Sequence, residues 1–378
     1  MTFTQSQQKV LSITTTCCGT LSFISSVTMV FTILRSKLKL SITYRRVIFG
    51  ISISDLALSL SCVASSFAMP KGLFWGAIGT KATCKIQAFV FSTGLLGSCF
   101  YSLSLSIYFF VIILLSMSER KLKRLEIILH TATILLALLS GIFLFVSDNF
   151  GPSGVQCWIE PNPPYCAALS NVECTSYGEP ASIRWIFAGF PIYFVFAMNC
   201  SILFLIWRSQ LKQARKNLRY RKGWMTTQSV DLKSEMNENR SDRDLTNLDI
   251  LATNLSKISK QEEKRMQHIR NRAYAFTLGY FFTYFFGSMY RLTEMYGRSE
   301  PSFAIVLLAR ITIPLQGLIN MMIYTYPHVE AYYRNHSGQN CIISWILAFC
   351  HVVKSGGDSD TKITRRLSQR RGRPISST

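Results

Sequence analysis

Seven apolar runs divide the chain, and each carries few or no charged residues. The hydrocarbon of a bilayer is about 30 Å thick, so a helix that rises ~1.5 Å per residue needs about 20 apolar residues to cross it. The pattern therefore predicts an all-α membrane protein, a bundle of seven transmembrane helices. The expected spans are residues 10–34, 47–69, 86–117, 125–146, 183–207, 274–290 and 303–326.

The third run, residues 86–117, carries small and hydroxyl side chains between its leucines and phenylalanines. Such residues let neighbouring backbones approach closely, which is typical of a helix surrounded by other helices rather than by lipid. We therefore expect this helix to be the hub of the bundle. The residues concerned are Ser92, Thr93, Gly94, Gly97, Ser98, Ser102, Ser104 and Ser106.

The charge of the chain is sparse and strongly positive. Of the 378 residues 49% are hydrophobic and 16% charged, yet the formal net charge is +21. Most of the 41 lysines and arginines fall in alternate loops and the tail, which by the positive-inside rule are cytoplasmic. The charge thus indicates membrane topology rather than nucleic-acid binding. We expect a multi-pass protein of the plasma membrane with its N-terminus outside and its C-terminus in the cytoplasm.

This topology defines two regions. Residues 1–335 form the transmembrane domain, and 336–378 form a cytoplasmic tail. Within the inner loop 208–273, a basic extension of the fifth span precedes a polar and acidic stretch, 226–247, that we expect to be disordered. The tail segment 340–353 is too short to span, so we expect it to lie in the membrane interface as a short helix.

Four cysteines fall on the expected outer side: Cys84, Cys157, Cys166 and Cys174. They permit three complete pairings. We favour Cys84 with Cys157, because that disulfide would tie the hub helix to the long loop over the mouth of the bundle. Cys166 and Cys174 would then close a small local ring.

The tail holds three candidate modification sites. Cys341 and Cys350 lie within the interfacial segment and are palmitoylation candidates, although packing without modification explains them equally well. Ser368 follows two arginines, so a basic-directed kinase could phosphorylate it, and the phosphate would offset part of a lipid-binding charge cluster.

No enzyme motif occurs in the sequence: there is no metalloprotease helix, nucleophile elbow, P-loop or dinucleotide fingerprint. No His, Cys and carboxylate cluster has the spacing of metal ligands. We therefore expect a protein of transport or signalling, without catalytic residues, rather than an enzyme.

Asp55 lies in the middle of the second span. A carboxylate there costs ~2.5–3.5 kcal/mol to insert and needs a polar partner inside the bundle. Ser98 in the third span and Asn320 in the seventh lie at similar depths, so we expect the three to form a hydrated cluster that could hold a cation. A hydrogen bond that serves packing alone is the alternative.

The seventh span contains Pro314 and Gly317, followed by Asn320 and Tyr324. Proline removes a backbone donor and glycine loosens the next turn, so we expect a bend here. A bend beside a buried Asn and an inner Tyr predicts a switch element.

Asp55, then Trp75 and Cys84, then Cys157-Trp-Ile, and finally P-L-Q-G-x-x-N-x-x-x-Y from Pro314 to Tyr324 form an ordered set of motifs. This set resembles the G protein-coupled receptors, most closely the cyclic-AMP-receptor-like group of slime moulds, diatoms and other protists. The resemblance covers about residues 10–335. It implies a receptor that rearranges its helices to engage a heterotrimeric G protein.

The chain also departs from the rhodopsin-like branch of that family. Tyr108-Phe109-Phe110 stands where the D-R-Y arginine would be, so the ionic lock of that branch cannot operate, and the sixth span lacks its usual proline. The seventh span has no lysine, which argues against a retinal Schiff base. We expect no cofactor.

Arg310 lies about one third of the way into the seventh span, too deep to reach the outer surface. With Arg184 and Arg291 at the outer ends of the fifth and sixth spans, it could bind a small anionic extracellular ligand. Alternatively, Arg310 pairs with a polar group or backbone carbonyls of a neighbouring helix.

The sequence as a whole predicts a receptor that couples to a heterotrimeric G protein. The basic inner extensions fit contact with a G-protein α subunit, and also attraction to anionic membrane lipid. The competing interpretation is a seven-span transporter or channel, which should show repeated halves or paired broken helices. Only one broken span is evident here.

Overall fold

The computed structural model describes residues 3–36, 39–115, 117, 119–160, 180–234, 242–295 and 302–335, with the single residues 347, 350 and 353. This part of the chain is mostly helical. Its long helices are α1 (Gln5–Arg35), α2 (Thr43–Ala64), α3 (Lys81–Phe110), α4 (Glu119–Val146), α6 (Phe190–Ser234), α7 (Asp242–Met295), α8 (Phe303–Thr312) and α9 (Gln316–Asn335).

Short elements join or extend these helices. The 3-10 turn η1 (Ser65–Ala68) continues α2, and the π-turn η2 (Val111–Leu115) continues α3. The short helix α5 (Pro180–Arg184) and the π-turn η4 (Trp185–Gly189) lead into α6. The strands β1 (Phe150–Ser153) and β2 (Gln156–Ile159) form an antiparallel hairpin.

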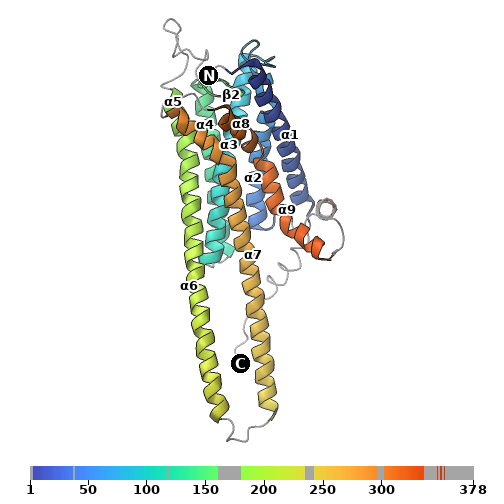
Figure 1. The fold of residues 1–378 in the computed structure, drawn as a ribbon, viewed down its shortest axis with the longest axis vertical. Coiled ribbons are helices and arrows are strands. Elements are labelled where there is room, and N and C mark those ends of the chain that lie inside the picture. The colour runs from blue at the N-terminus through green and yellow to red at the C-terminus, as the bar shows by residue number, and fades with distance from the viewer. Residues whose placement is uncertain are drawn as a thin grey trace.

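The helices lie side by side in a bundle, with the hairpin at the end where α1 begins (Figure 1). At the opposite end α6 and α7 extend well beyond the other helices (Figure 1). Helix α3 contacts α2, α4, α6 and α7 as well as both strands. It occupies the central position that its small and hydroxyl residues predicted.

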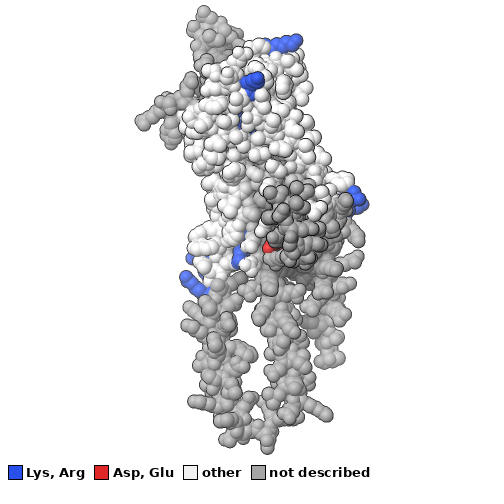
Figure 2. All heavy atoms as spheres, turned by 45° about the vertical axis from the view of Figure 1, so that its right-hand side comes forward, with Lys and Arg blue, Asp and Glu red and all other residues white. Residues whose placement is uncertain are grey.

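The apolar helices and their lengths identify a multi-pass membrane protein. Five helices, and the bent pair α8 and α9, are long and apolar enough to cross a bilayer. On the face drawn in Figure 2, the described lysines and arginines lie near the two ends of the bundle, and the middle carries none. A band without charge between two charged ends matches hydrocarbon between two aqueous faces.

The sixth expected span, 274–290, lies within α7. As far as the structure describes it, α7 is long enough to cross a bilayer but is not among the helices apolar enough to do so. Its tyrosines, Tyr274, Tyr280, Tyr284 and Tyr290, lower the mean hydropathy. Their rings remain largely apolar and pack well inside the bundle: Tyr280 and Tyr284 are both buried. Helix α7 therefore packs with the other helices although its sequence is less apolar than theirs.

Close backbone contacts and interhelical hydrogen bonds hold α1, α2 and α3 together. A Cβ atom added at Gly94 of α3 would lie 2.5 Å from the backbone nitrogen of Leu58 in α2. On α1, Ser12 shares a 2.7 Å hydrogen bond with Ser66 of η1. In a membrane, where lipid is as apolar as leucine, such small residues and interhelical hydrogen bonds supply the packing energy.

One feature of the fold differs from the all-α expectation. The loop between α4 and α5 contains the β1–β2 hairpin, in which Phe150, Cys157 and Ile159 are buried and Gly154 takes the positive φ of the turn. In the loop between the fifth and sixth expected spans, where disorder is predicted over 226–247, the described residues are helical up to Ser234 and again from Asp242. No proline occurs between Pro191 and Pro301, so no residue of that kind interrupts either helix.

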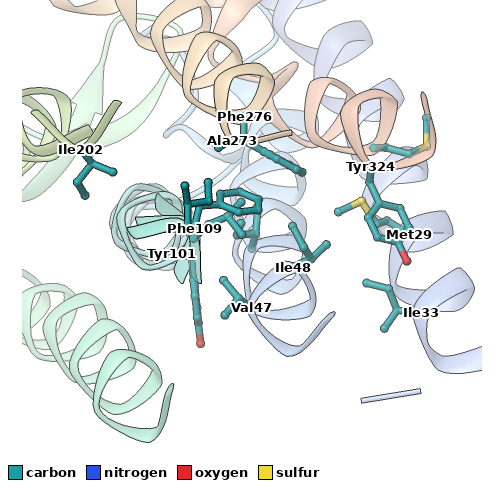
Figure 3. Packing of buried hydrophobic residues seen from close by; sticks show 14 of the residues in the cluster. Met29, Ile33, Val47, Ile48, Tyr101, Phe109, Ile202, Ala273, Phe276 and Tyr324 are labelled. Carbon is teal, nitrogen blue, oxygen red and sulfur yellow. The ribbon is translucent and has the colours of Figure 1, made fainter. Parts of the chain in front are cut away.

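A hydrophobic core fills the bundle at the end away from the hairpin. Figure 3 shows its side chains converging from α1, α2, α3, α6, α7 and α9. Phe109, Phe276, Ile48 and Tyr324 are among them, and all are buried. This packing joins six helices in the half of the bundle that lies away from the hairpin, and so couples their positions.

Helices α8 and α9 meet at a bend of 48°. The bend lies at Ile313 to Leu315, so the kink expected from Pro314 is present. The backbone N–H of Gly317, just past the bend, donates a 3.0 Å hydrogen bond to the hydroxyl of Ser22 on α1. A side chain of another helix thereby satisfies a donor near the interrupted helix.

Candidate functional site

A cavity of about 340 Å³ opens at the hairpin end of the bundle. It lies between β2, the outer part of α3, the η4–α6 junction, the end of α7 and helix α8. Its volume is at the lower end of the range for small-molecule sites, about 300–1,000 Å³. The polar and aromatic residues that line it are Phe91, Gln156, Trp158, Arg184, Trp185, Tyr193, Tyr284, Ser288, Tyr290, Arg291 and Arg310.

The hairpin is anchored over this cavity by a disulfide. Cys84 at the start of α3 and Cys157 on β2 are bonded, with their Cα atoms 5.3 Å apart, so the predicted pairing is confirmed. Gln87, one turn further along α3, accepts a 3.1 Å hydrogen bond from the backbone N–H of Cys157. Its side-chain amide donates to the backbone carbonyls of Ser61 and Ser65, 2.9 and 2.7 Å away. A covalent bond and a buried amide thus fix β2 against α2 and α3.

An ion-pair cluster adds to this anchorage beside the hairpin. Asp148, between α4 and β1, pairs with Lys85 and, at 3.5 Å, with Lys81. Partial burial raises the pKa of the Asp148 carboxyl, but the hydrogen bond and charge of Lys85, helped by Lys81, outweigh it and lower the pKa below its ordinary value. The carboxylate is therefore charged at neutral pH and connects the start of α3 to the end of α4.

The three arginines predicted for a ligand site all line the cavity. Arg184 lies 3.3 Å from the carboxylate of Glu160, which offsets its charge. Arg291 stacks its guanidinium over the rings of Trp158 and Tyr290, 4.6 and 4.7 Å from their centroids. The structure therefore brings together cations from three separate helices.

Arg310 lies close to the turn of the hairpin. Its Nη2 atom lies 3.9 Å from the point where a Cβ on Gly154 would sit. Its position on α8 thus directs the guanidinium towards the hairpin turn and the cavity rather than into the lipid. No carboxylate is among the residues that line the cavity in the described chain.

Aromatic rings form two walls of the cavity. On one side Trp185 and Tyr193 stack face to face, with centroids 5.7 Å apart at 12°. On the other, Trp158 meets Phe91 edge to face, 5.8 Å away at 82°. The indole N–H of Trp158 is buried and has no hydrogen-bond partner among the described residues. The cavity therefore combines positive charge, flat apolar walls and an available donor.

Deeper in the bundle, Asp55, Ser98 and Asn320 meet. The Ser98 hydroxyl donates a 2.7 Å hydrogen bond to one carboxylate oxygen of Asp55, and the Asn320 amide donates one of 2.7 Å to the other. All three side chains are buried. Three helices, α2, α3 and α9, are thus joined at one carboxylate.

Tyr324 and Pro314, predicted to act with this cluster, lie elsewhere on the same span. Pro314 is at the bend between α8 and α9, towards the cavity. Tyr324 is one helical turn past Asn320 and stacks on Tyr44 of α2, with ring centroids 6.5 Å apart. The cluster lies between them, so the seventh span connects the cavity, the carboxylate and the inner core in order.

Most of the remaining predicted sites lie outside the described residues: Cys166, Cys174, Cys341 and Ser368. Cys350 is described, is exposed and is not in a disulfide. These sites remain predictions.

Several cavity residues were not identified from the sequence as site residues. Trp158 is in the quoted Cys157-Trp-Ile motif, and its place next to a cysteine expected over the mouth of the bundle could have indicated it. Trp185, Tyr193 and Tyr284 carry no such signal, since aromatic residues are common throughout these helices. Gln87 appears in sequence as one polar residue near a helix start.

No protein-family model and no curated protein matches this sequence. Among the 602 chains of solved structures that resemble the fold is the crystal structure of squid rhodopsin. That match has a TM-score of 0.55 and 16% sequence identity, and covers 96% of this chain and 93% of the squid chain. This protein therefore has a rhodopsin-like fold.

Proposed function

We propose that the chain is a seven-helix receptor of the plasma membrane that transmits an extracellular signal to a heterotrimeric G protein. The observation that carries this proposal is the GPCR-like fold over nearly the whole chain, combined with a cavity closed by a disulfide-anchored hairpin. Within that family, the sequence motifs favour the cyclic-AMP-receptor-like group.

In this proposal the N-terminus and the hairpin are outside the cell. A disulfide at the hairpin end fits an oxidising exterior, and the basic loops fit a cytoplasmic opposite end. All seven expected spans then cross the membrane, α7 included. Epitope tags test this directly: an N-terminal tag should be reached by antibody on intact cells, and a C-terminal tag only after permeabilisation.

The cavity is the proposed ligand site, with Arg184, Arg291 and Arg310 selecting a small anion. A cleft lined by charges of one sign raises the local concentration of oppositely charged ligands. Ligand contact with α8 would reach Asp55 through the bend and Asn320. We propose that this carboxylate, with or without a bound cation, is one of the groups whose interactions change on activation.

The basic inner extension of α6 is the proposed contact with the G-protein α subunit. Lys212 and Arg215 are exposed on this extension. We expect replacement of both by glutamine to slow G-protein nucleotide exchange several-fold, because complementary charge speeds association. Lys71→Gln, an exposed change at the hairpin end, is the matched control and should have no effect.

The deciding experiment reconstitutes the purified protein in nanodiscs of neutral lipid with a promiscuous Gα and its βγ subunits. Exchange of GDP for a labelled GTP analogue should be faster than with empty discs, and the double variant should lose most of the increase. Neutral lipid removes attraction to anionic headgroups as an explanation. Exchange no faster than in empty discs, across a ligand library, would refute the receptor function.

A further inference from the structure

The residues that line the cavity at the hairpin end restrict the chemistry of a ligand beyond the sign of its charge. Six of its lining residues are aromatic: Phe91, Trp158, Trp185, Tyr193, Tyr284 and Tyr290. They belong to α3, β2, the η4–α6 junction and α7, so rings face the cavity from several sides. A ligand that fills this space meets ring faces and edges wherever it is not in contact with an arginine.

Three arginines line the cavity. Arg184 pairs with Glu160 and so holds α5 to the end of β2. Arg291 is stacked on two rings, and a guanidinium stacked by its face keeps its N–H donors at its edge. Arg310, from α8, points to the hairpin turn over the same space. Arg291 and Arg310 are therefore the groups placed to bind an anion.

A third observation is independent of the arginines. The buried indole N–H of Trp158 has no acceptor among the described residues, and Trp158 lines the cavity. A buried donor without an acceptor is unfavourable until an acceptor arrives. An oxygen of a ligand acid group that lies against Arg291 would be beside this indole, because Arg291 stacks on the same ring.

We propose that the ligand is an aromatic acid: a planar ring system bearing a carboxylate, sulfonate or phosphate. Its acid group binds between Arg310, Arg291 and the indole N–H of Trp158, and its ring packs against the aromatic walls. This inference rests on the receptor function proposed above and specifies the ligand class. The cavity of about 340 Å³ restricts the ligand to a few rings and excludes a bare inorganic anion as the complete ligand, because it would leave the aromatic walls unfilled.

The test compares three matched probes on the purified protein in nanodiscs by calorimetric titration. They are 2-naphthoate, the neutral 2-naphthamide, and the saturated acid decahydro-2-naphthoate. We expect 2-naphthoate to bind about tenfold or more tightly than either, because the amide lacks the charge-assisted hydrogen bonds and the saturated acid lacks ring contacts. Equal affinity for acid and amide, equal affinity for the two acids, or no binding of 2-naphthoate would each overturn the proposal.

Single substitutions test which side chains bind the acid group of the ligand. Arg310→Gln should remove most of the preference for acid over amide and leave amide binding unchanged, whereas Lys123→Gln, exposed near the start of α4 away from the cavity, should change neither. Trp158→Phe retains a ring and removes the donor, so it should weaken the acid several-fold. If Arg310→Gln is too unstable to titrate, Trp158→Phe and the wild-type probe series still decide. Binding with this preference but without G-protein exchange would overturn the receptor function and leave the ligand class standing.

A separate observation lies at the other end of the bundle. The guanidinium of Arg272 on α7 lies over the ring of Tyr44 on α2, 5.5 Å from its centroid. The same ring packs against Tyr108 and Phe109 of α3, at 6.1 and 6.0 Å, and against Tyr324 of α9. This tyrosine of α2 therefore contacts three other helices, where the chain has aromatic residues in place of an arginine-based ionic lock.

We infer that the contact between Arg272 and Tyr44 holds the inner end of α7 against α2 and α3. An outward movement of α7 must separate this cation from the ring, at a cost typical of cation–π pairs. The contact thereby biases the bundle towards its closed arrangement.

Spin labels test this without a G protein. Labels introduced as unnatural amino acids at Gln267 on α7 and Leu115 at the end of η2, both exposed, report the separation of the inner ends. Arg272→Gln and Tyr44→Leu should shift the distance distribution to longer values, and Tyr44→Phe, which keeps the ring, should not. Distributions unchanged by both disruptive variants would overturn the inference.

Discussion

The crossing of α2 and α3 at Gly94 offers the sharpest test of how this bundle is packed. A Cβ atom at Gly94 would lie 2.5 Å from the Leu58 nitrogen and 3.0 Å from the Ser54 carbonyl oxygen, both backbone atoms of α2. Ordinary contacts of a Cβ begin near 3.4 Å. Backbone cannot rotate away as a side chain can, so Gly94→Ala must push the two helices apart.

The expected cost follows from that displacement. Overpacking of a tight interior costs about 1–3 kcal/mol, while an alanine in place of a helical glycine recovers about 0.5–1 kcal/mol of backbone entropy. The added Cβ would contact backbone at 2.5 Å, so the overpacking cost should fall in the upper part of that range, and the net loss is about 1–2.5 kcal/mol. At about 2–4 °C per kcal/mol, the apparent unfolding temperature should fall by several degrees.

A matched control lies one turn further along α3. At Gly97 the added Cβ would meet only the side chain of Ser54, 2.6 Å from its hydroxyl oxygen. A change of the serine rotamer relieves that contact, so Gly97→Ala should be neutral, and the double variant with Ser54→Ala should be at least as stable as the wild type.

The assay is thermal unfolding of the purified protein in nanodiscs, followed with a thiol-reactive dye that reports newly exposed cysteines. Gly94→Ala and Gly97→Ala are measured at the same scan rate, because unfolding of membrane proteins is often irreversible. If Gly94→Ala unfolds at the wild-type temperature, or if both variants lose the same amount, direct backbone contact does not govern this crossing.

Three further results are expected. Asp55→Asn keeps the size of the side chain but removes its charge, and should reduce ligand-stimulated nucleotide exchange and its dependence on sodium; no change in either assigns the cluster to packing alone. Cys157→Ser should free the hairpin from Cys84 and weaken 2-naphthoate binding at least tenfold, with limited proteolysis of the outer loop as the physical readout. Because the pKa of Asp148 is lowered in the folded protein, its ion pairs stabilise the fold above the ordinary carboxyl pKa, and this contribution disappears as the pH falls through the lowered value. Asp148→Asn, which tolerates the positive φ found there, should therefore cost ~0.2–1 kcal/mol at pH 7 and nothing in strong acid, and an equal loss at both pH values would contradict the assignment.

The sequence predicted the parts of this protein that the bilayer itself dictates. The thickness of the hydrocarbon fixes the length of each apolar run, so the spans could be located without knowledge of their neighbours. A buried carboxylate must find polar partners, which made Ser98 and Asn320 reasonable candidates for Asp55. Pro314 disrupts its own helix, so the bend was also a local prediction.

The rest depends on contacts between distant segments. The aromatic walls of the cavity form because Trp158, from an outer loop, meets Phe91 and Arg291 from two different helices, and no local pattern specifies that meeting. The hairpin escaped prediction because its strands are only four residues each. Helix α7 is less apolar than its neighbours because tyrosine scores as polar, although its ring packs as an apolar group.

The hydrogen bond from the Gly317 amide to Ser22 gives α1 a part in the proposed transmission of the signal. If α8 and α9 straighten or twist when a ligand binds, that hydrogen bond must lengthen or the amide must find a new acceptor. The neighbouring turn of α1 is then displaced as well. Helix α1 then supports the bend between α8 and α9, and substitutions along its serine-rich side would change how readily that bend moves.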